Sequence, residues 1–318
     1  MGILTRTKRQ REDFKAILEN EEASHQYCLD LANTELDFAK RTEAWKRFEV
    51  MMAVVPEGDV NIMNTDASRY SPDGRLELGG GLLMNVESFY IDKFAVSNED
   101  FLAFVQANGY ENREFWPEEI YPHVLQFTDL NGFAGPQFWA NGMPAEDRLH
   151  HPVVGICWYE ANAFALWAGK RLPTCAEWQR AGTWPGKGTE IKFPWGSSFD
   201  PKVCNTWNSG IGDTVPVYDF DEGSSPNGVY QLSGNVWEWV GTLFECDESD
   251  GAQVFMEQPM AEIRGGAFDT YFASQATCQF RSGHSLLKRS HNIGFRCAIS
   301  VDSLNLPSDP YAFFDEED

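Results

Sequence analysis

The part of the chain that follows residue 183 offers few helix or strand signals, although it contains five tryptophans. Its short apolar runs are separated by turns dense in Gly, Asn, Asp and Pro. Regular ladders cannot satisfy the backbone of such a segment, so we expect buried aromatics, with bound ions or hydrogen-bonded turns, to hold it together. The tryptophans concerned are Trp184, Trp195, Trp207, Trp237 and Trp239. The chain is therefore expected to fold with a large share of ordered loop.

Residues 8–52 contain no Gly or Pro and are rich in Glu, Lys, Arg, Leu and Ala, which favours helix. Apolar residues recur at steps of three to four, so the segment predicts one long or two shorter amphipathic helices, ended by Pro56 and Gly58. The apolar stripe packs either on the rest of this chain or against a partner helix. Because the heptad repeat is not sustained, we favour the first, and we keep residues 8–52 as a candidate docking segment.

Between residues 53 and 183, strand-like runs alternate with two helices. The strand-like runs are Met52–Val55, Val60–Met63, Leu82–Tyr90 and Val153–Trp158. One helix is predicted over Asn98–Gln106, because Ser97 and Asp100 form a start that resembles a capping box, and another over Trp158–Trp167. The expected divisions are a helical segment over 1–52, one domain over 53–300 and a solvated acidic tail over 301–318.

The chain carries 48 Asp and Glu against 25 Lys and Arg, for a formal net charge of −23. Such a field repels phosphate backbones and anionic headgroups, so we expect neither nucleic acid nor a membrane surface as a partner. No run of 18 apolar residues occurs, and the basic N-terminus has no apolar segment behind it. Seven scattered cysteines without a CxxC pair exclude a zinc ribbon. We expect a soluble, cytoplasmic protein.

A series of short motifs runs through residues 53–300. They are VVPEG at 54–58, FYIDKFAVSN at 89–98, HPVVG at 151–155, WAGKRLPT at 167–174, AEW at 176–178, FPWG at 193–196, NGVYQLSGNVWEW at 227–239, RGG at 264–266 and NIGFR at 292–296. In this order they resemble the formylglycine-generating-enzyme, or sulfatase-modifying-factor, family. The resemblance implies a C-type-lectin-like α+β fold with a small irregular sheet region, two helices and much ordered loop.

Members of that family that generate formylglycine work through two cysteines between the RGG and GFR motifs. The resemblance places them near Asp269 or Thr270 and near Thr277, where this chain has only Cys278, one residue away from the second position. A lone thiol can bind copper or act as a nucleophile only with a lowered pKa and a co-ligand. Cys278 is therefore either a small buried hydrophobic residue or part of a copper or iron site with His284 or His291.

Two further comparisons with the family bear on metals and disulfides. The sulfoxide-synthase relatives hold iron with three imidazoles, partly from a separate N-terminal domain, but residues 1–52 here offer only His25. Iron is therefore disfavoured. In secreted members the cysteine after the GFR motif pairs with one in the helix before WAGKRLP, but here Cys297 faces Ala165. A reducing, cytoplasmic setting explains that difference.

Calcium is the cofactor that the resemblance favours. Family calcium ligands map onto one group formed by Asn205 and Thr206 and onto a second group formed by Gln231, Gly234, Val236 and Glu238. The second group combines a carboxylate with backbone and side-chain oxygens, as a hard cation requires. The alternative is that Glu238 caps backbone amides of its own loop.

Because the fold motifs are present and the cysteine pair is not, we expect a non-catalytic binding protein for an unidentified protein or small-molecule ligand. The expected binding surface lies in residues 267–291, where aromatic and small polar residues mix. Its candidate residues are Tyr271, Phe272, Gln275, Gln279, Phe280, His284 and Ser285. Retroelement-diversified proteins of the same fold carry their variable residues in this stretch. Three alternatives stay open: Phe272 and Phe280 are core residues, the chain is a metal-dependent oxidoreductase, or it is a structural subunit of an assembly.

Overall fold

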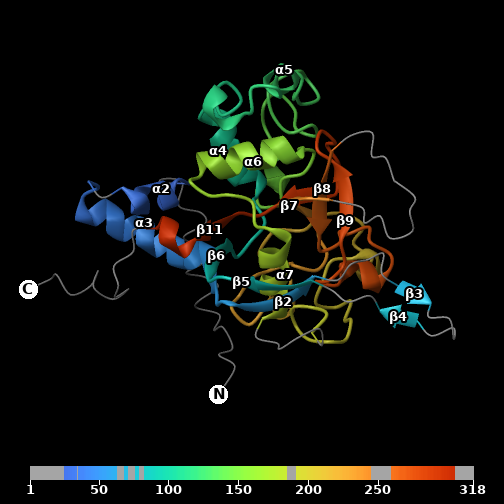
Figure 1. Ribbon diagram of the computed structural model, residues 1–318. Helices are drawn as coiled ribbons and strands as arrows, with labels where there is room; N and C mark the ends of the chain where they lie inside the picture. Colours follow the sequence, from blue (N-terminus) through green and yellow to red (C-terminus); the bar gives the residue numbers. More distant parts are fainter. Residues whose placement is uncertain are drawn as a thin grey trace, which may run out of the picture.

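The strands of this protein form small sheets joined by long ordered loops, as the computed structural model shows for residues 25–33, 35–62, 68–70, 76–78, 82–184, 191–244 and 259–304 (Figure 1). The helices are α2 (Tyr27–Ala32), α3 (Phe38–Met51), α4 (Asn98–Gln106), α5 (Tyr121–Val124), α6 (Trp158–Trp167) and α7 (Cys175–Thr183). The strands are β1 (Met52–Val55), β2 (Gly58–Ile62), β3 (Ser68–Tyr70), β4 (Leu76–Leu78), β5 (Leu82–Val86), β6 (Phe89–Asp92), β7 (Trp237–Leu243), β8 (Met260–Arg264), β9 (Ser282–Ser285), β10 (Ile293–Phe295) and β11 (Ala298–Ser300).

The largest sheet in the described ranges brings three of the sequence motifs together. Its strand order is β10-β7-β8-β9, while β1-β6-β11, β2-β5 and β3-β4 form smaller sheets. In the large sheet, Glu238 on β7 lies opposite Gly294 of the parallel strand β10 and opposite Arg264 of the antiparallel strand β8. The WEW, GFR and RGG motifs are therefore neighbours in space, although up to 58 residues separate them along the chain.

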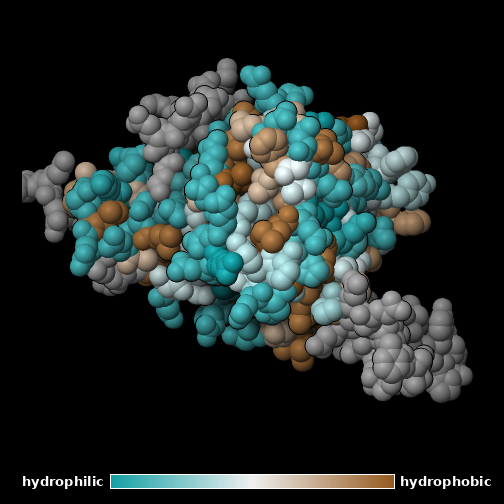
Figure 2. All heavy atoms as spheres, turned by 90° about the horizontal axis from the view of Figure 1, so that it is seen from above, coloured by the Kyte–Doolittle hydropathy of each residue, from teal (hydrophilic) through white to brown (hydrophobic). Residues whose placement is uncertain are grey.

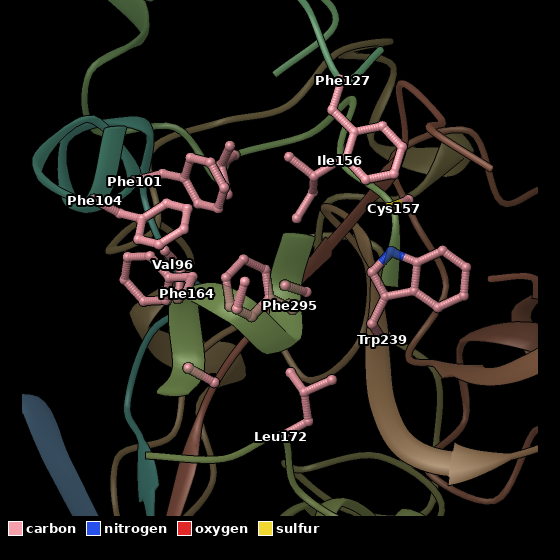
Figure 3. Packing of buried hydrophobic residues seen from close by; sticks show 14 of the residues in the cluster. Val96, Phe101, Phe104, Phe127, Ile156, Cys157, Phe164, Leu172, Trp239 and Phe295 are labelled. Atoms are coloured by element: carbon pink, nitrogen blue, oxygen red, sulfur yellow. The ribbon is translucent and has the colours of Figure 1, made fainter. Parts of the chain in front are cut away.

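Two predicted helices form where the sequence placed them. The Ser97 hydroxyl accepts the Asp100 backbone amide at 3.1 Å and the Asp100 carboxylate accepts the Ser97 amide at 3.2 Å, which is the reciprocal capping that starts α4. Helix α6 spans the predicted Trp158–Trp167. The two helices contribute Phe101, Phe104 and Phe164 to an aromatic core that also receives residues from the large sheet (Figure 3).

The strand predicted over Val153–Trp158 is wrong. The backbone there bonds to three separate loops instead of to one ladder: the Val153 amide donates to Val96 O at 2.9 Å, the Gly155 amide to Ser290 O at 2.8 Å, and Gly155 O accepts the Gln137 amide at 2.8 Å. Gly155 has φ +74°, a conformation that ends an extended run.

The expectation about buried tryptophans holds for Trp239 but not for Trp207. Trp239 is fully buried in the aromatic core, whereas Trp207 is among the most exposed large apolar side chains of the described residues. The remaining three are half-buried. Hydrogen-bonded turns and side-chain amides, and not these tryptophans, hold much of the loop-rich half together.

The helices α2 and α3 pack on the body of the same chain. Tyr27, Trp45 and Phe48 share a buried cluster with Phe94 and Ile299, which lie in the domain. This is the arrangement that the sequence favoured for the second part of the apolar stripe, where Trp45 and Phe48 are buried, whereas Leu29 and Ala32 of the first part are exposed. Residues 8–24 and the tail from 305 lie outside the described residues. Among the described helices, none is both long and apolar enough to cross a bilayer.

Candidate functional site

Cys278 lies in the protein interior. Its side chain is fully buried in a core cluster with Trp178 and Leu232. The sulfur occupies space that only a glycine leaves open, because a β-carbon built on Gly182 of α7 would lie 2.5 Å from Sγ. Burial raises the pKa of the Cys278 thiol to about 12, although the nearby Arg264 guanidinium opposes the shift. The thiol is therefore protonated at neutral pH, which is the opposite of what nucleophilic or metal-binding chemistry requires.

The two histidines proposed as co-ligands engage other groups. The His284 ring lies edge-on to Trp239, with centroids 6.1 Å apart, and burial lowers the pKa of His284. His291 is exposed, packs against Phe268, and lies 3.7 Å from the Asp269 carboxylate. No group of three or more His, Cys, Asp or Glu that could hold a metal occurs within the described ranges. These residues do not fit a copper or iron centre at Cys278.

Asp269 and Thr270, the two candidate positions for the first cysteine of the family's pair, have structural roles. Asp269 accepts hydrogen bonds from the Asn292 side-chain amide at 3.0 and 3.2 Å, which ties the segment to the strand that follows. The Thr270 hydroxyl accepts the Ala267 amide at 2.8 Å and closes the turn after the RGG motif. Both side chains therefore stabilise the loop backbone.

Arg264 fixes the inner side of the same segment. This fully buried guanidinium donates from Nη1 to the carbonyl oxygens of Cys278 at 3.2 Å and of Gln279 and Phe280 at 3.4 Å. Its Nε pairs with Glu262 on the same strand. A charged group held this way clamps the loop onto β8, so the outer face of the loop has a fixed shape.

The outer face carries exposed aromatic rings. Tyr271 and Phe272 are each 62% exposed, and their ring centroids lie 5.1 Å apart. Trp207 joins them from a separate loop, 6.3 Å from Tyr271, and its backbone amide donates to Thr270 O at 3.2 Å. We call these three residues the aromatic face. The alternative that Phe272 is a core residue is wrong, whereas Phe280 is half-buried beside Trp237.

A pocket of about 480 Å³ opens beside the aromatic face. One wall comes from residues 273–279 and the other from the segment after the α7 helix. The lining residues are Lys192, Phe193, Ser197, Phe199, Ala273, Ser274, Thr277 and Gln279. Phe193 stacks on Trp195 at 5.2 Å, and the Gln279 side-chain amide donates to Ile191 O at 2.6 Å, which fixes the two walls relative to each other.

The structure brings together only part of the predicted binding residues. Gln279 lines the pocket, Gln275 lies in the 3₁₀ turn of residues 273–276, and Tyr271 and Phe272 lie on the aromatic face. His284 and Ser285 instead belong to β9, where they pair with Ala261 and Met260 of β8. Sequence reasoning missed the wall around Phe193, although the FPWG motif that contains it was visible.

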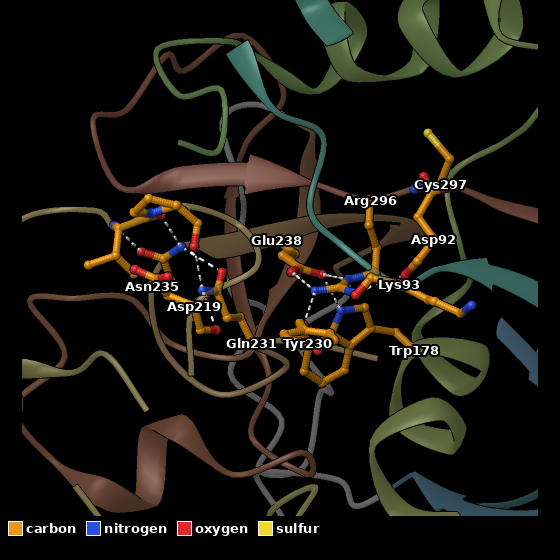
Figure 4. Close-up of polar contacts among 12 residues, drawn as sticks. Asp92, Lys93, Trp178, Asp219, Tyr230, Gln231, Asn235, Glu238, Arg296 and Cys297 are labelled. Atoms are coloured by element: carbon orange, nitrogen blue, oxygen red, sulfur yellow. Dashed lines mark hydrogen bonds and ion pairs between the residues drawn. The ribbon is translucent and has the colours of Figure 1, made fainter. Parts of the chain in front are cut away.

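The Glu238 carboxylate, a predicted calcium ligand, faces an arginine (Figure 4). Arg296 donates to it from Nε at 2.7 Å and from Nη2 at 2.6 Å, and Trp178 Nε1 donates to the Oε2 atom at 2.7 Å. All three groups are buried. A guanidinium and an indole N–H therefore supply the positive charge and the donors that a cation would otherwise supply.

The other predicted calcium ligands belong to a network of side-chain amides. The Gln231 amide group donates to Pro216 O at 2.9 Å and to Asp219 O at 3.1 Å, and its oxygen accepts from Asn235 Nδ2 at 2.7 Å. Asn205 Nδ2 donates to Asp213 O at 2.8 Å.

Donors thus occupy the side-chain oxygens of Glu238 and Gln231, which does not fit calcium coordination by these two residues. Gly234 and Val236 lie in the same turn, where Gly234 has φ +88° and packs against the Asn205 backbone. Thr206 is buried beside them. Calcium binding stays a prediction.

Comparison with known proteins agrees with the fold. Residues 40–301 match the family model described as a sulfatase-modifying factor enzyme 1-like domain. The chain is 31% identical, over 78% of its length and 92% of the relative's, to a formylglycine-generating enzyme of Thermomonospora curvata. It is also 31% identical, over 78% of its length and 88% of the relative's, to the inactive C-alpha-formylglycine-generating enzyme 2 of Bos taurus.

Two solved structures have the same fold. PvdO from Pseudomonas aeruginosa superposes with a TM-score of 0.53 at 23% identity, over 79% of this chain and 94% of that one. Treponema denticola variable protein 1 superposes with a TM-score of 0.51 at 16% identity, over 78% of this chain and 94% of that one. The predicted C-type-lectin-like α+β fold of the formylglycine-generating-enzyme type is confirmed.

Proposed function

The chain belongs to the sulfatase-modifying factor enzyme 1-like domain family, and we propose that it is a non-catalytic recognition protein within that family. Its ligand, a protein or a small molecule, binds to the aromatic face of Trp207, Tyr271 and Phe272 and to the adjoining pocket. The relatives named above include one called an enzyme and one called inactive, at the same 31% identity. Sequence identity therefore does not decide whether this chain is an enzyme. The residues of the site have to decide it.

One observation carries the proposal: the segment 267–291 buries its only thiol and exposes two adjacent aromatic rings. Cys278 is fully buried, while Tyr271 and Phe272 of the same segment are mostly exposed. Two adjacent exposed aromatic side chains present a large apolar area to water. A ligand that covers them removes this area from water, which favours binding. A segment arranged this way suits contact with a ligand far better than chemistry at sulfur.

The chemistry of the surface supports a mixed apolar and polar ligand. The aromatic face offers rings for stacking, while hydroxyls of Ser197, Ser274 and Thr277 and the cation of Lys192 surround the pocket. Arg264 holds the loop from inside, so little conformational entropy is lost on binding. Diversification of residues 267–291 among related chains is part of the proposal. The six described cysteines are all free and buried, which supports a reducing compartment such as the cytoplasm.

The test uses arrays of immobilised glycans and of synthetic peptides, probed with the full-length protein. We expect wild type to bind a defined subset, and the variant Trp207→Ala/Tyr271→Ala/Phe272→Ala to lose at least tenfold in affinity for that subset. A matched control replaces two other exposed apolar residues, Leu82 and Leu83 of β5, by serine. Equal binding by wild type and the aromatic variant, or equal loss in the control, would contradict the proposal.

The second candidate is the metal-dependent oxidoreductase that the sequence left open. It requires an accessible thiolate or a group of imidazoles near Cys278. Because neither occurs in the described residues, we keep it as the outcome that would overturn the first candidate.

A further inference from the structure

The loop of residues 125–143, between α5 and α6, exposes an unusual number of large apolar side chains. Leu125 is 71% exposed and Leu130 is 70% exposed, and Phe133, Phe138 and Met143 are each about half exposed. Five of the exposed large apolar side chains of the described residues lie within these 19 residues, and gathered exposed apolar groups mark interaction sites. Figure 2 looks down on the side of the molecule that α5 caps in Figure 1 and shows hydrophobic groups there among hydrophilic ones.

This loop is held in one shape by a buried carboxylate at its centre. Asp129 accepts the backbone amides of Asn131 at 2.8 Å, Phe133 at 3.0 Å and Gly142 at 2.7 Å. Burial alone would raise the pKa of Asp129, but these amides outweigh it and lower the pKa.

Arg289 ties the loop to the body by donating to Thr128 O at 2.9 Å and to Gly135 O. Trp139 donates from its indole to Asn98 at 2.9 Å and anchors the far side. Because the backbone is fixed before any partner arrives, the apolar side chains are presented at a small entropic cost.

The segments that flank the loop in the sequence are mainly acidic. Between Arg113 and Arg148 the chain has six acidic residues and no Lys or Arg. Five of the six are exposed, and only Asp129 is buried. The exposed five are Glu114, Glu118, Glu119, Glu146 and Asp147. No ion pair joins any of these five to a Lys, Arg or His in the part of the chain that the structure describes.

This combination selects among the possible occupants. A second copy of the chain would bring another set of carboxylates, and another net charge of −23, against the first. An anionic lipid surface is disfavoured for the same reason. A partner whose own apolar face is flanked by Lys and Arg satisfies both the apolar side chains and the unpaired carboxylates.

We propose that residues 125–143 form a docking surface for a basic, amphipathic polypeptide segment of a partner protein. This surface shares no residue with the aromatic face or its pocket and is a second recognition surface, in addition to the one proposed above. Leu130 and Phe133 belong to the turn whose backbone Asp129 holds, and they are 70% and 54% exposed.

The test measures fluorescence anisotropy of a labelled helical model peptide of Leu and Lys, with an apolar face and a basic face, added to the full-length protein. A peptide of the same composition in scrambled order separates apolar docking from simple charge attraction. We expect the amphipathic peptide to bind at least tenfold more tightly than the scrambled one, and Leu130→Ser/Phe133→Ser to remove that difference. The control Leu82→Ser/Leu83→Ser, on side chains 66% and 67% exposed outside the loop, should retain it.

Three outcomes would overturn the proposal. The first is equal affinity for the two peptides. The second is an unchanged preference in the Leu130→Ser/Phe133→Ser variant, with circular dichroism showing that the variant is folded. The third is self-association of wild type at micromolar concentration in sedimentation velocity that Leu130→Ser/Phe133→Ser abolishes, because the occupant would then be a second copy.

Discussion

The sulfur of Cys278 lies only 2.5 Å from the position that a β-carbon of residue 182 would take, so a side chain there would overlap it. The glycine of α7 and the cysteine of the 267–291 segment are therefore complementary in shape. This contact makes Cys278 a packing residue.

The contact predicts a specific double-mutant cycle. Gly182→Ala would normally favour a helix by about 0.5–1 kcal/mol, but here the added methyl overlaps Sγ and should destabilise the fold by about 1–3 kcal/mol. Adding Cys278→Ala removes the overlap, so the double variant should be close in stability to Cys278→Ala alone. Urea unfolding of the four proteins measures the coupling. Additive effects would show that the two residues do not touch.

The thiol should be unreactive in the folded protein. With the pKa of Cys278 raised to about 12, only about one molecule in ten thousand is ionised at pH 8. We expect iodoacetamide to label Cys278 only after unfolding, as read by peptide mass spectrometry.

The same raised pKa links stability to pH. The pKa of Cys278 in the folded protein exceeds that of the unfolded thiol, which is near 9. The contribution of this thiol to the stability of the fold is therefore complete below pH 9 and is lost as the pH rises from 9 towards 12. Cys28 and Cys204 act in the same direction. Cys278→Ala should therefore make the loss of stability above pH 9 less steep than in wild type. Rapid labelling of Cys278 by iodoacetamide in the native protein at pH 8 would contradict the raised pKa on which both predictions depend.

The Glu238–Arg296 pair gives a prediction about calcium. If arginine is the counterion, the midpoint of thermal unfolding should differ by less than about 1 °C between 1 mM CaCl₂ and 1 mM EGTA, because a ligand stabilises only the state it binds. Arg296→Met should lower stability by about 3–5 kcal/mol, since it leaves a buried carboxylate without its partner. A midpoint that falls by several degrees in EGTA would show that calcium binds.

The Asp129 carboxylate should control the docking loop through its amides. The pKa of Asp129 is lowered in the folded protein. The carboxylate therefore stabilises the fold above the unfolded pKa, which is near 3.8, and this stabilisation is lost as the pH falls through the folded pKa. Asp129→Ala should therefore speed hydrogen exchange at Asn131, Phe133 and Gly142 at neutral pH and leave the α7 amides unchanged. Unchanged exchange at the three loop amides would contradict the assigned role.

Local rules were enough for some elements and not for others. The capping residues Ser97 and Asp100 located α4, because both partners lie within one turn of sequence. The run Val153–Trp158 has strand composition, but its bonding partners come from loops far away in the chain. Apolar composition alone cannot distinguish a ladder from an extended segment held by several loops.

The site could be predicted only where the information was local. The absence of a second cysteine beside Cys278 was visible, and so was the aromatic character of residues 271–272. The pocket wall at Phe193, about 80 residues away, and the role of Gln231 as a donor to two carbonyl oxygens depend on tertiary placement. Trp207 was expected inside, because a tryptophan is more often buried than shown on the surface.

The central claim is that this protein recognises a ligand and does not oxidise a thiol at Cys278. The most direct measurement is oxygen uptake by the full-length protein with one equivalent of copper or iron and a thiol substrate, comparing wild type with Cys278→Ser. The account predicts equal uptake by both proteins, at the level of the metal alone. Uptake by wild type that exceeds that level and is lost in Cys278→Ser would contradict it.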